Sequence, residues 1–316
     1  MDITNIYNKP FVIVPKIDVP DLGRGVLPVQ RFGQFVRAIR ESSVIIKEAR
    51  ILNAMKSYEV DISRISLGVE LEAGRDETGS KVAPTDDEVE VTTNTLSMKE
   101  LTTAVTIEDE ALEDNIEQQQ FEQTIVSLLG EGISYDLEVY FLHADTTYTG
   151  DRALLKTNDG WLTLAGEKVT DTDPTNETWP TNLFDDMIEA LENKYKQKLP
   201  QMKFYVSYQI WKAYKDQLKG RETGLGDQAL TGGDGVPYDG VPVQYVPALD
   251  ALNDGKVRAL LTIPTNLVYG FWRNIRIEPA RDARMRRTSY IATLRADCHY
   301  EDENAAVSAK IAAPTP

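Results

Sequence analysis

A long polar hairpin followed directly by a long helix is the feature that most constrains how this chain can fold. Residues 58 to 65 alternate between apolar and polar side chains, which predicts a strand with Val60, Ile62 and Ile65 near one face. A return run rich in valine, threonine and leucine extends from Val89 to Ile107. The middle of the segment between them is acidic and glycine-rich, with no large apolar side chain to hold it in a core. A hairpin this long and polar is not stable alone, so we expect it to lie on another surface, most easily that of a neighbouring subunit.

A helix is predicted to begin directly after the hairpin. Glu108, Asp109 and Glu110 would occupy its first turn, where carboxylates complement the helix dipole. Apolar residues then recur at helical spacing, namely Leu112, Ile116, Phe121, Ile125, Leu128, Leu129, Ile133, Leu137, Tyr140 and Phe141. Gly130 and Gly132 interrupt this stripe, which indicates a kink or a close crossing of another backbone. Roughly ten turns would span on the order of 50 Å, which is long enough for a spine and too long for an ordinary core.

The N-terminal region predicts an extended arm and a short helix. Prolines at positions 10, 15, 20 and 28 forbid a helix over residues 1 to 30 and favour an arm that drapes over another surface. From Arg31 to Lys47, apolar residues recur at spacings of three and four between charged ones, which predicts a modest amphipathic helix.

The second half of the chain reads as an α/β unit followed by two strands. Residues 146 to 180 are polar and predict a loop with at most a short hairpin around Trp161 to Leu164. The elements expected after it are a helix over 183–195, a strand over 202–206, a helix over 208–218, a glycine-rich stretch over 220–240, strands over 241–246 and 259–263, and two return strands over 275–278 and 290–300 joined by residues 279–288.

Composition and charge narrow the class of protein. The 316 residues are 41% apolar, which suits a folded protein, and no apolar run approaches the length of a membrane span. The N-terminus lacks a secretory signal, so we expect a cytoplasmic product. The net charge of −16 disfavours a nucleic-acid binder but suits a protein that lies near DNA without binding it. Seven arginines and two acids between Arg273 and Arg295 indicate either a solvated strand face or a partner surface for acidic segments.

No catalytic, cofactor-binding or metal site emerges from the sequence. Residues 224 to 229 fit a dinucleotide-binding pattern but lack the buried strand that should precede it, which favours a flexible loop. His143 and His299 lack the spacing of metal ligands. Cys298 is alone and is expected to be a small buried side chain. A soluble α/β enzyme that uses residues 181 to 269 stays open as an alternative, although no catalytic set supports it.

The order of these parts resembles that of the major capsid protein of tailed bacteriophages, an icosahedral shell fold that encapsulins share. The segments that carry the resemblance are residues 69–74, 84–86, 89–91 and 96–101 in the hairpin, 105–114 at the helix entry, and 204–207 with 238–243 around the glycine-rich stretch. No single segment is diagnostic, and the resemblance rests on their order over nearly the whole chain.

The resemblance implies an α+β fold, the phage major capsid fold. Its parts would be an N-terminal arm (1–30), a short helix region (31–57), an extended β-hairpin loop (58–107), a long spine helix with the peripheral domain (108–180), an axial α/β domain (181–269), and peripheral return strands with a C-terminal tail (270–316). Intersubunit contacts would then fall at Gly74, Arg75, Asp76, Glu77, Gly79, Lys81, Arg284, Arg286 and Arg287. A loop at the centre of each capsomer would contain Gly224, Gly226, Gly232, Gly233 and Gly235.

The implied function is self-assembly through hexamers and pentamers into a shell that encloses double-stranded phage DNA. The partners would be further copies of this chain, with a separate scaffolding protein, a portal and a decoration protein as further candidates and no membrane. We expect no fused scaffolding segment ahead of the arm, and therefore either a separate scaffolding protein or none. Some members cross-link a loop lysine to an asparagine; Lys81 is a candidate lysine, but Asn274 only neighbours the right region, so we expect a non-covalent shell. The shell would be assembled in the host cytoplasm and found in the virion. An encapsulin is the alternative, which the early prolines disfavour because encapsulins begin with a helix.

Overall fold

The computed structural model describes residues 43–55, 57–67, 89–108, 119–219, 237–272 and 276–314. The chain divides into two compact units. The larger unit comprises residues 40–101, 134–273 and 294–316, and the smaller one comprises residues 1–39, 102–133 and 274–293.

A five-stranded sheet forms the centre of the larger unit, with strand order β5-β12-β8-β6-β7. The strands are β5 (Glu167–Val169), β12 (Ala306–Ala312), β8 (Lys256–Thr262), β6 (Lys203–Val206) and β7 (Val243–Tyr245). β8 pairs antiparallel with both neighbours, whereas β5 and β7 pair in parallel at the edges. Every residue of β8 after Lys256 is buried, because both faces of the sheet are covered.

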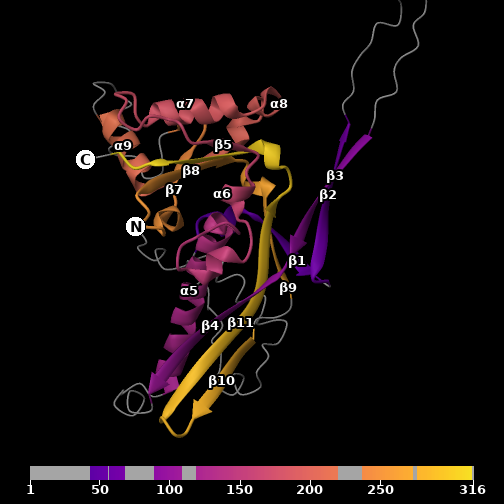
Figure 1. Ribbon diagram of the computed structural model, residues 1–316, viewed down its shortest axis with the longest axis vertical. Helices are drawn as coiled ribbons and strands as arrows, with labels where there is room; N and C mark the ends of the chain where they lie inside the picture. Colours follow the sequence, from indigo (N-terminus) through magenta and orange to yellow (C-terminus); the bar gives the residue numbers. More distant parts are fainter. Residues whose placement is uncertain are drawn as a thin grey trace, which may run out of the picture. The chain divides into compact units, whose positions relative to one another are not determined.

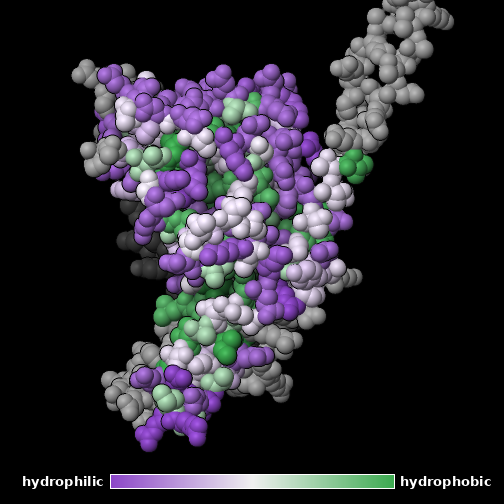
Figure 2. Space-filling model, viewed as in Figure 1, coloured by the Kyte–Doolittle hydropathy of each residue, from purple (hydrophilic) through white to green (hydrophobic). Residues whose placement is uncertain are grey.

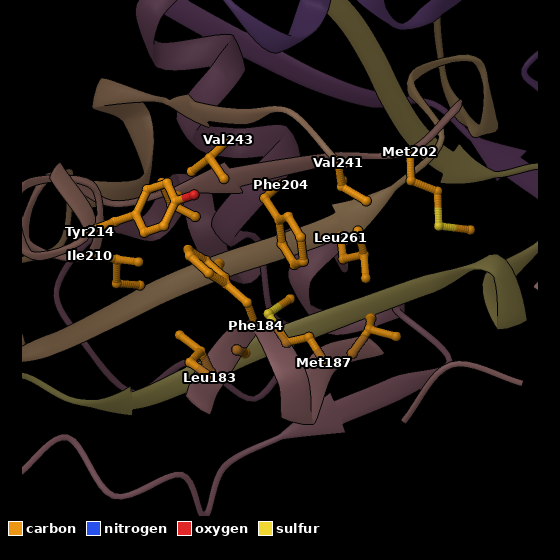
Figure 3. Close-up of a cluster of buried hydrophobic side chains, with 14 of the residues drawn as sticks. Leu183, Phe184, Met187, Met202, Phe204, Ile210, Tyr214, Val241, Val243 and Leu261 are labelled. Carbon is orange, nitrogen blue, oxygen red and sulfur yellow. The ribbon is translucent and has the colours of Figure 1, made fainter. Parts of the chain in front are cut away.

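Helices α7 (Thr181–Ala190) and α9 (Tyr208–Lys219) supply the apolar cover of one face, and Figure 1 shows α7 lying along the sheet. Leu183, Phe184 and Met187 recur at helical spacing and are fully buried. The Phe184 ring lies 4.7 Å from that of Phe204 and 5.5 Å from that of Tyr214 (Figure 3). The predicted helix over 183–195 is broken after Ala190 and resumes as α8 (Asn193–Lys196).

A second sheet contains β1 (Arg50–Met55), β9 (Leu267–Trp272), β11 (Arg287–Tyr300) and β10 (Arg276–Asp282) in that order, and β4 (Lys99–Glu108) also pairs with β11. In the larger unit, the C-terminal part of β11 pairs with β9. In the smaller unit, its N-terminal part pairs with β10. The two strands run further than predicted: residues 279–282 and 287–288, expected in the connection, are paired, and only residues 283–286 form the turn.

The predicted hairpin is present as β2 (Glu59–Leu67) and β3 (Val89–Ser97), which pair without interruption over nine residues. Two expectations were wrong. The return run is not one strand, because β3 ends at Ser97 and β4 begins at Lys99 in the other sheet. Regular pairing also puts positions 62 and 65 on opposite faces, so Ile65 does not share a face with Ile62.

The spine helix is α5 (Gln119–His143), whose 25 residues span about 37 Å. Glu108, predicted to open this helix, is instead the last residue of β4, and residues 109–118 lie outside the described part. Buried apolar residues follow the predicted stripe from Leu129 to Phe141, but Leu128 is 59% exposed. Gly130 and Gly132 are both helical, and no described atom lies within 4 Å of a Cβ built on Gly132, so the close crossing considered there is not seen at that residue.

Shorter elements complete the described part. α3 (Ile45–Glu48) falls in the predicted N-terminal helix, of which only residues 43–47 are described. Trp161–Leu164 form the short helix α6, so the hairpin expected there was wrong. The 3-10 turns are η1 (Ala153–Lys156), η2 (Leu199–Gln201), η3 (Pro247–Asp250), η4 (Pro264–Asn266) and η5 (Glu303–Ala305). β12, within the stretch that the sequence grouped with the return strands, pairs instead in the sheet of the α/β unit.

Hydrophilic residues gather over α7 and α8 and at the end of the β10–β11 hairpin (Figure 2). Within the described ranges, no helix combines the length and the apolar character that crossing a membrane requires.

Candidate functional site

A small apolar cluster fixes the base of the β2–β3 hairpin to the rest of the larger unit. Ile62, Leu96, Met98 and Val268 are buried together, with Leu52 and Trp272 packed against them. Ile62 of β2 and Leu96 of β3 lie on the same face of the hairpin, as the register in which the two strands pair requires. Burial of these side chains opposes any rotation of the hairpin about its base.

An ion pair fastens the same face of the hairpin. Arg64 contacts Asp302 through its Nη1, 2.6 Å from Oδ2. The Tyr195 hydroxyl donates to the same carboxylate, and Arg64 Nη2 lies 3.5 Å from the Tyr195 oxygen. Asp302 is itself positioned because its backbone N–H donates to the Asn266 side chain at 2.8 Å. The sequence did not single out this contact, because Arg64 and Asp302 lie far apart in the chain.

A buried carboxylate holds the junction between β3 and β4. Asp297 Oδ2 accepts the backbone N–H of Ser97 at 2.6 Å, and Oδ1 accepts the backbone N–H of Cys298 at 2.7 Å. The Asn158 amide also donates to Oδ1. Burial raises the pKa of Asp297 to about 6, although these donors and the charge of Lys99 act in the opposite direction. The sequence gave no reason to single out Asp297, because its role depends on strands far apart in the chain.

The β10–β11 hairpin, in the smaller unit, ends in a basic turn, which we define as residues 284–287. Arg284, Met285, Arg286 and Arg287 are all exposed. The Asp282 carboxylate accepts the backbone N–H groups of Arg284 and Met285, which shapes the turn. Arg287 lies 3.7 Å from Asp282, with both side chains more than two-fifths exposed, so this pair contributes little to stability.

The structure places three of the predicted contact residues and leaves the others outside its described part. Arg284, Arg286 and Arg287 meet in the basic turn. The predicted residues that lie outside the described part are Gly74, Arg75, Asp76, Glu77, Gly79 and Lys81 of the hairpin loop, Asn274, and the capsomer-centre glycines at 224, 226, 232, 233 and 235.

The two histidines and the cysteine that were considered as catalytic or metal-binding residues are buried or hydrogen-bonded within the fold. His143 is buried and its Nε2 donates to the Ala248 carbonyl at 2.7 Å, while burial lowers the pKa of its imidazole to about 4. Cys298 is buried, which raises the pKa of its thiol. His299 Nδ1 accepts the backbone N–H of Tyr300. In the described part of the chain, no group of three or more His, Cys, Asp or Glu side chains is placed to hold a metal ion.

The fold is that of a phage capsid subunit. Among solved structures, that of the satellite phage P4 procapsid with its size determination (Sid) protein aligns over 91% of this chain and 92% of the other chain, with a TM-score of 0.63 at 17% identity. The structure of Gordonia phage Cozz aligns over 86% and 87%, with a TM-score of 0.57 at 15% identity.

Comparison of the sequence with known proteins indicates the same class of protein. The phage capsid family matches residues 23–311, and the chain therefore belongs to that family. The prophage capsid protein YqbE of Bacillus subtilis (strain 168) is 29% identical over 291 residues, which cover 89% of this chain and 91% of YqbE. The chain is a capsid shell protein, as the resemblance predicted, and its place is in the virion capsid.

Proposed function

We propose that this chain is the major capsid protein of a tailed phage and that its copies assemble through hexamers and pentamers into an icosahedral shell around double-stranded DNA. The observation that carries the proposal is the fixed base of the β2–β3 hairpin, with its apolar cluster and its Arg64–Asp302 ion pair. Because its base is fixed, the hairpin can link a contact made beyond its described strands to the body of its own subunit. The role is structural rather than catalytic.

The loop between β2 and β3 is the segment that would reach a neighbouring subunit. Its sequence includes Glu70, Glu72, Asp76 and Glu77, and it joins strands that end at Leu67 and begin at Val89. Acidic residues of this kind are complementary to the basic turn of another copy, where Arg284, Arg286 and Arg287 are exposed. Each such contact is weak, but a closed symmetric shell repeats it many times.

The net charge of −16 supports enclosure of DNA without binding to it, because an acidic inner surface repels phosphate. The glycine-rich stretch between α9 and β7 would adapt to the slightly different geometries at the centres of hexamers and pentamers. The shell would be non-covalent and assembled in the host cytoplasm, with a scaffolding protein, a portal and a decoration protein as candidate partners.

Shortening the loop tests this function. Replacement of residues 74–79 by a short Gly-Ser turn should leave a folded subunit that no longer closes shells, as judged by circular dichroism and negative-stain electron microscopy. A matched variant, Asp76→Asn with Glu77→Gln, keeps the length and removes two charges. If length and charge both matter, this control should form fewer shells than the wild type but more than the shortened chain. Normal shells from the shortened chain would contradict the proposed role of the loop.

A further inference from the structure

A pocket of about 190 Å³ lies in the larger unit, and no residue of either hairpin lines it. Its lining includes His143 at the end of α5, Asp145 just after it, Lys168 of β5, Arg258 of β8, and Ser308 and Lys310 of β12. Neither the assembly surfaces nor the apolar core accounts for this combination of charged residues around one space.

Strand register brings the cations together on one face of the five-stranded sheet. Lys310 is directly opposite Arg258, and Lys168 is directly opposite Ser308. Ser308 and Lys310 are two residues apart on β12, so all four side chains leave the same face. The alternate residues of β12, Val307 and Ala309, belong to the apolar cluster on the other face, which confirms the alternation. Three adjacent strands therefore direct three cations and a hydroxyl to one side of the sheet.

This arrangement is electrostatically unfavourable when nothing occupies it. Like charges directly opposite each other on paired strands repel, and Lys310 faces Arg258 in this way. The Arg258 side chain is only 1% exposed, so water screens its charge poorly. Lys310 is also affected by this repulsion. Burial is the main cause that lowers the pKa of its ammonium group, and the positive charges of Arg258 and Lys256 lower it further.

The acids near the pocket offset only part of this charge. Asp254 pairs with Arg258 and also accepts the backbone N–H of Lys256. Asp145 Oδ1 accepts the backbone N–H and the hydroxyl of Thr147. His143 adds no charge near neutral pH because burial holds its pKa at about 4. Three cations thus meet two carboxylates that already have other partners, which leaves one positive charge at a pocket in a chain of net charge −16.

We propose that this pocket binds a small oxyanion of the phosphate class. Arg258 has donors beyond the two contacts that it makes to Asp254 and to the Lys256 carbonyl. Guanidinium and ammonium groups both bind phosphate, the first by its planar pair of donors and the second as a point charge. The Ser308 hydroxyl supplies a neutral donor between Lys168 and Lys310. A bound oxyanion would separate the two opposed cations and so stabilise the sheet edge formed by β5 and β12.

Calorimetric titration of the full chain with inorganic phosphate, in a low-salt buffer near neutral pH, tests the site. Saturable binding of one phosphate per chain is expected. Lys310→Gln and Lys168→Gln should each weaken it by roughly tenfold or more, because each removes a charge-assisted contact. Lys212→Gln, an exposed lysine of α9 outside the pocket, is the matched control and should bind as the wild type does. Absence of saturable binding, or equal binding by Lys310→Gln, would overturn the proposal.

Two further measurements keep the test decisive. At the same phosphate concentration, the melting temperature of the wild type and of Lys212→Gln should rise more than that of Lys310→Gln, which is expected to fold because Lys310 is exposed. A short oligothymidylate, titrated in parallel, distinguishes free phosphate from a nucleic-acid backbone. Binding of the oligonucleotide alone, weakened in Lys310→Gln, would overturn the free-phosphate site in favour of a nucleic-acid contact. The site does not depend on shell formation, so its failure would leave the proposed function untouched.

Discussion

The β2–β3 hairpin and the β10–β11 hairpin are both antiparallel ribbons, yet their described residues have different surroundings. Near its base, the first has buried Ile62 and Leu96 and a side chain ion-paired to Asp302. The second ends in the basic turn, where Met285 is 63% exposed and the Arg287–Asp282 pair is open to solvent. The comparison suggests that substitutions at the first site should change the stability of the subunit, and substitutions at the second should change assembly.

The largest expected effect is at the base of the β2–β3 hairpin. Leu96→Ala should lower the free energy of unfolding by roughly 2–5 kcal/mol, because it leaves a cavity at a fully buried position. Val91→Ala is the matched control on the same strand: Val91 is 57% exposed, and the change should stay within about 0.5 kcal/mol. Urea unfolding of the unassembled subunit measures both. Equal changes in the free energy of unfolding at the two positions would contradict the distinction between the buried base of the hairpin and its exposed surface.

The buried carboxylate at the β3–β4 junction should make this base sensitive to pH. The pKa of Asp297 is about 6 in the folded chain, against roughly 3.9 for an unfolded aspartate. As the pH rises, the unfolded chain loses this proton first. Asp297 therefore makes its full contribution to the free energy of unfolding below about pH 4. This contribution, roughly 3 kcal/mol, is lost as the pH rises through about 6.

Asp297→Asn isolates this effect because asparagine does not ionise. The difference in unfolding free energy between the variant and the wild type should move in favour of the variant by up to roughly 3 kcal/mol from about pH 4 to pH 7. Other carboxylates titrate in both proteins and cancel in the difference. Urea unfolding at several pH values gives the profile, and a difference that stays constant with pH would show that Asp297 has an ordinary pKa.

A smaller effect is expected from the ion pair that fastens the hairpin. Arg64→Ala should reduce the free energy of unfolding by roughly 1–3 kcal/mol, since it leaves the largely buried Asp302 carboxylate without its charged partner. A double-mutant cycle with Asp302→Asn separates the pair from the other contacts of each residue. Arg284→Ala serves as a control, because its side chain is exposed in the basic turn. Additive effects of Arg64→Ala and Asp302→Asn would show that the two residues are not coupled.

The smallest effect on stability is expected at the basic turn. Arg284→Gln, Arg286→Gln and Arg287→Gln together should change the free energy of unfolding by no more than about 0.5 kcal/mol. The same triple variant should assemble less efficiently, and wild-type assembly should weaken with added salt, which screens exposed charges. Light scattering over a salt series measures this. Wild-type and triple-variant curves that coincide would rule out an assembly role for the turn.

The elements that the sequence predicted best are those whose apolar spacing is local. β6 and α9 lie where the pattern put them, and α7 begins within two residues of the predicted start but ends at Ala190, before the predicted end at 195. β1, β9 and β12 were not predicted as strands, since each is a short run whose partner lies far away, as when Ala306 pairs with Thr262. Local pattern also misjudged Glu108, where an acidic residue typical of a helix start ends a strand.

The candidate site could be predicted only in part for the same reason. The cluster of arginines near 284–287 is visible in composition, and the structure places it in one exposed turn. The contacts of Arg64 with Asp302 and of Asp297 with Ser97 join residues two hundred or more positions apart. No local sequence pattern predicts them for that reason. The cation pair Lys310–Arg258 is likewise a product of strand register.

The most direct test is negative-stain electron microscopy, with light scattering, of the full chain expressed alone and with a candidate scaffolding protein. A structural shell subunit should give closed shells or rings of capsomer size in at least one of the two preparations. A folded monomer in both, with no larger species by scattering, would contradict assembly as the activity of this chain.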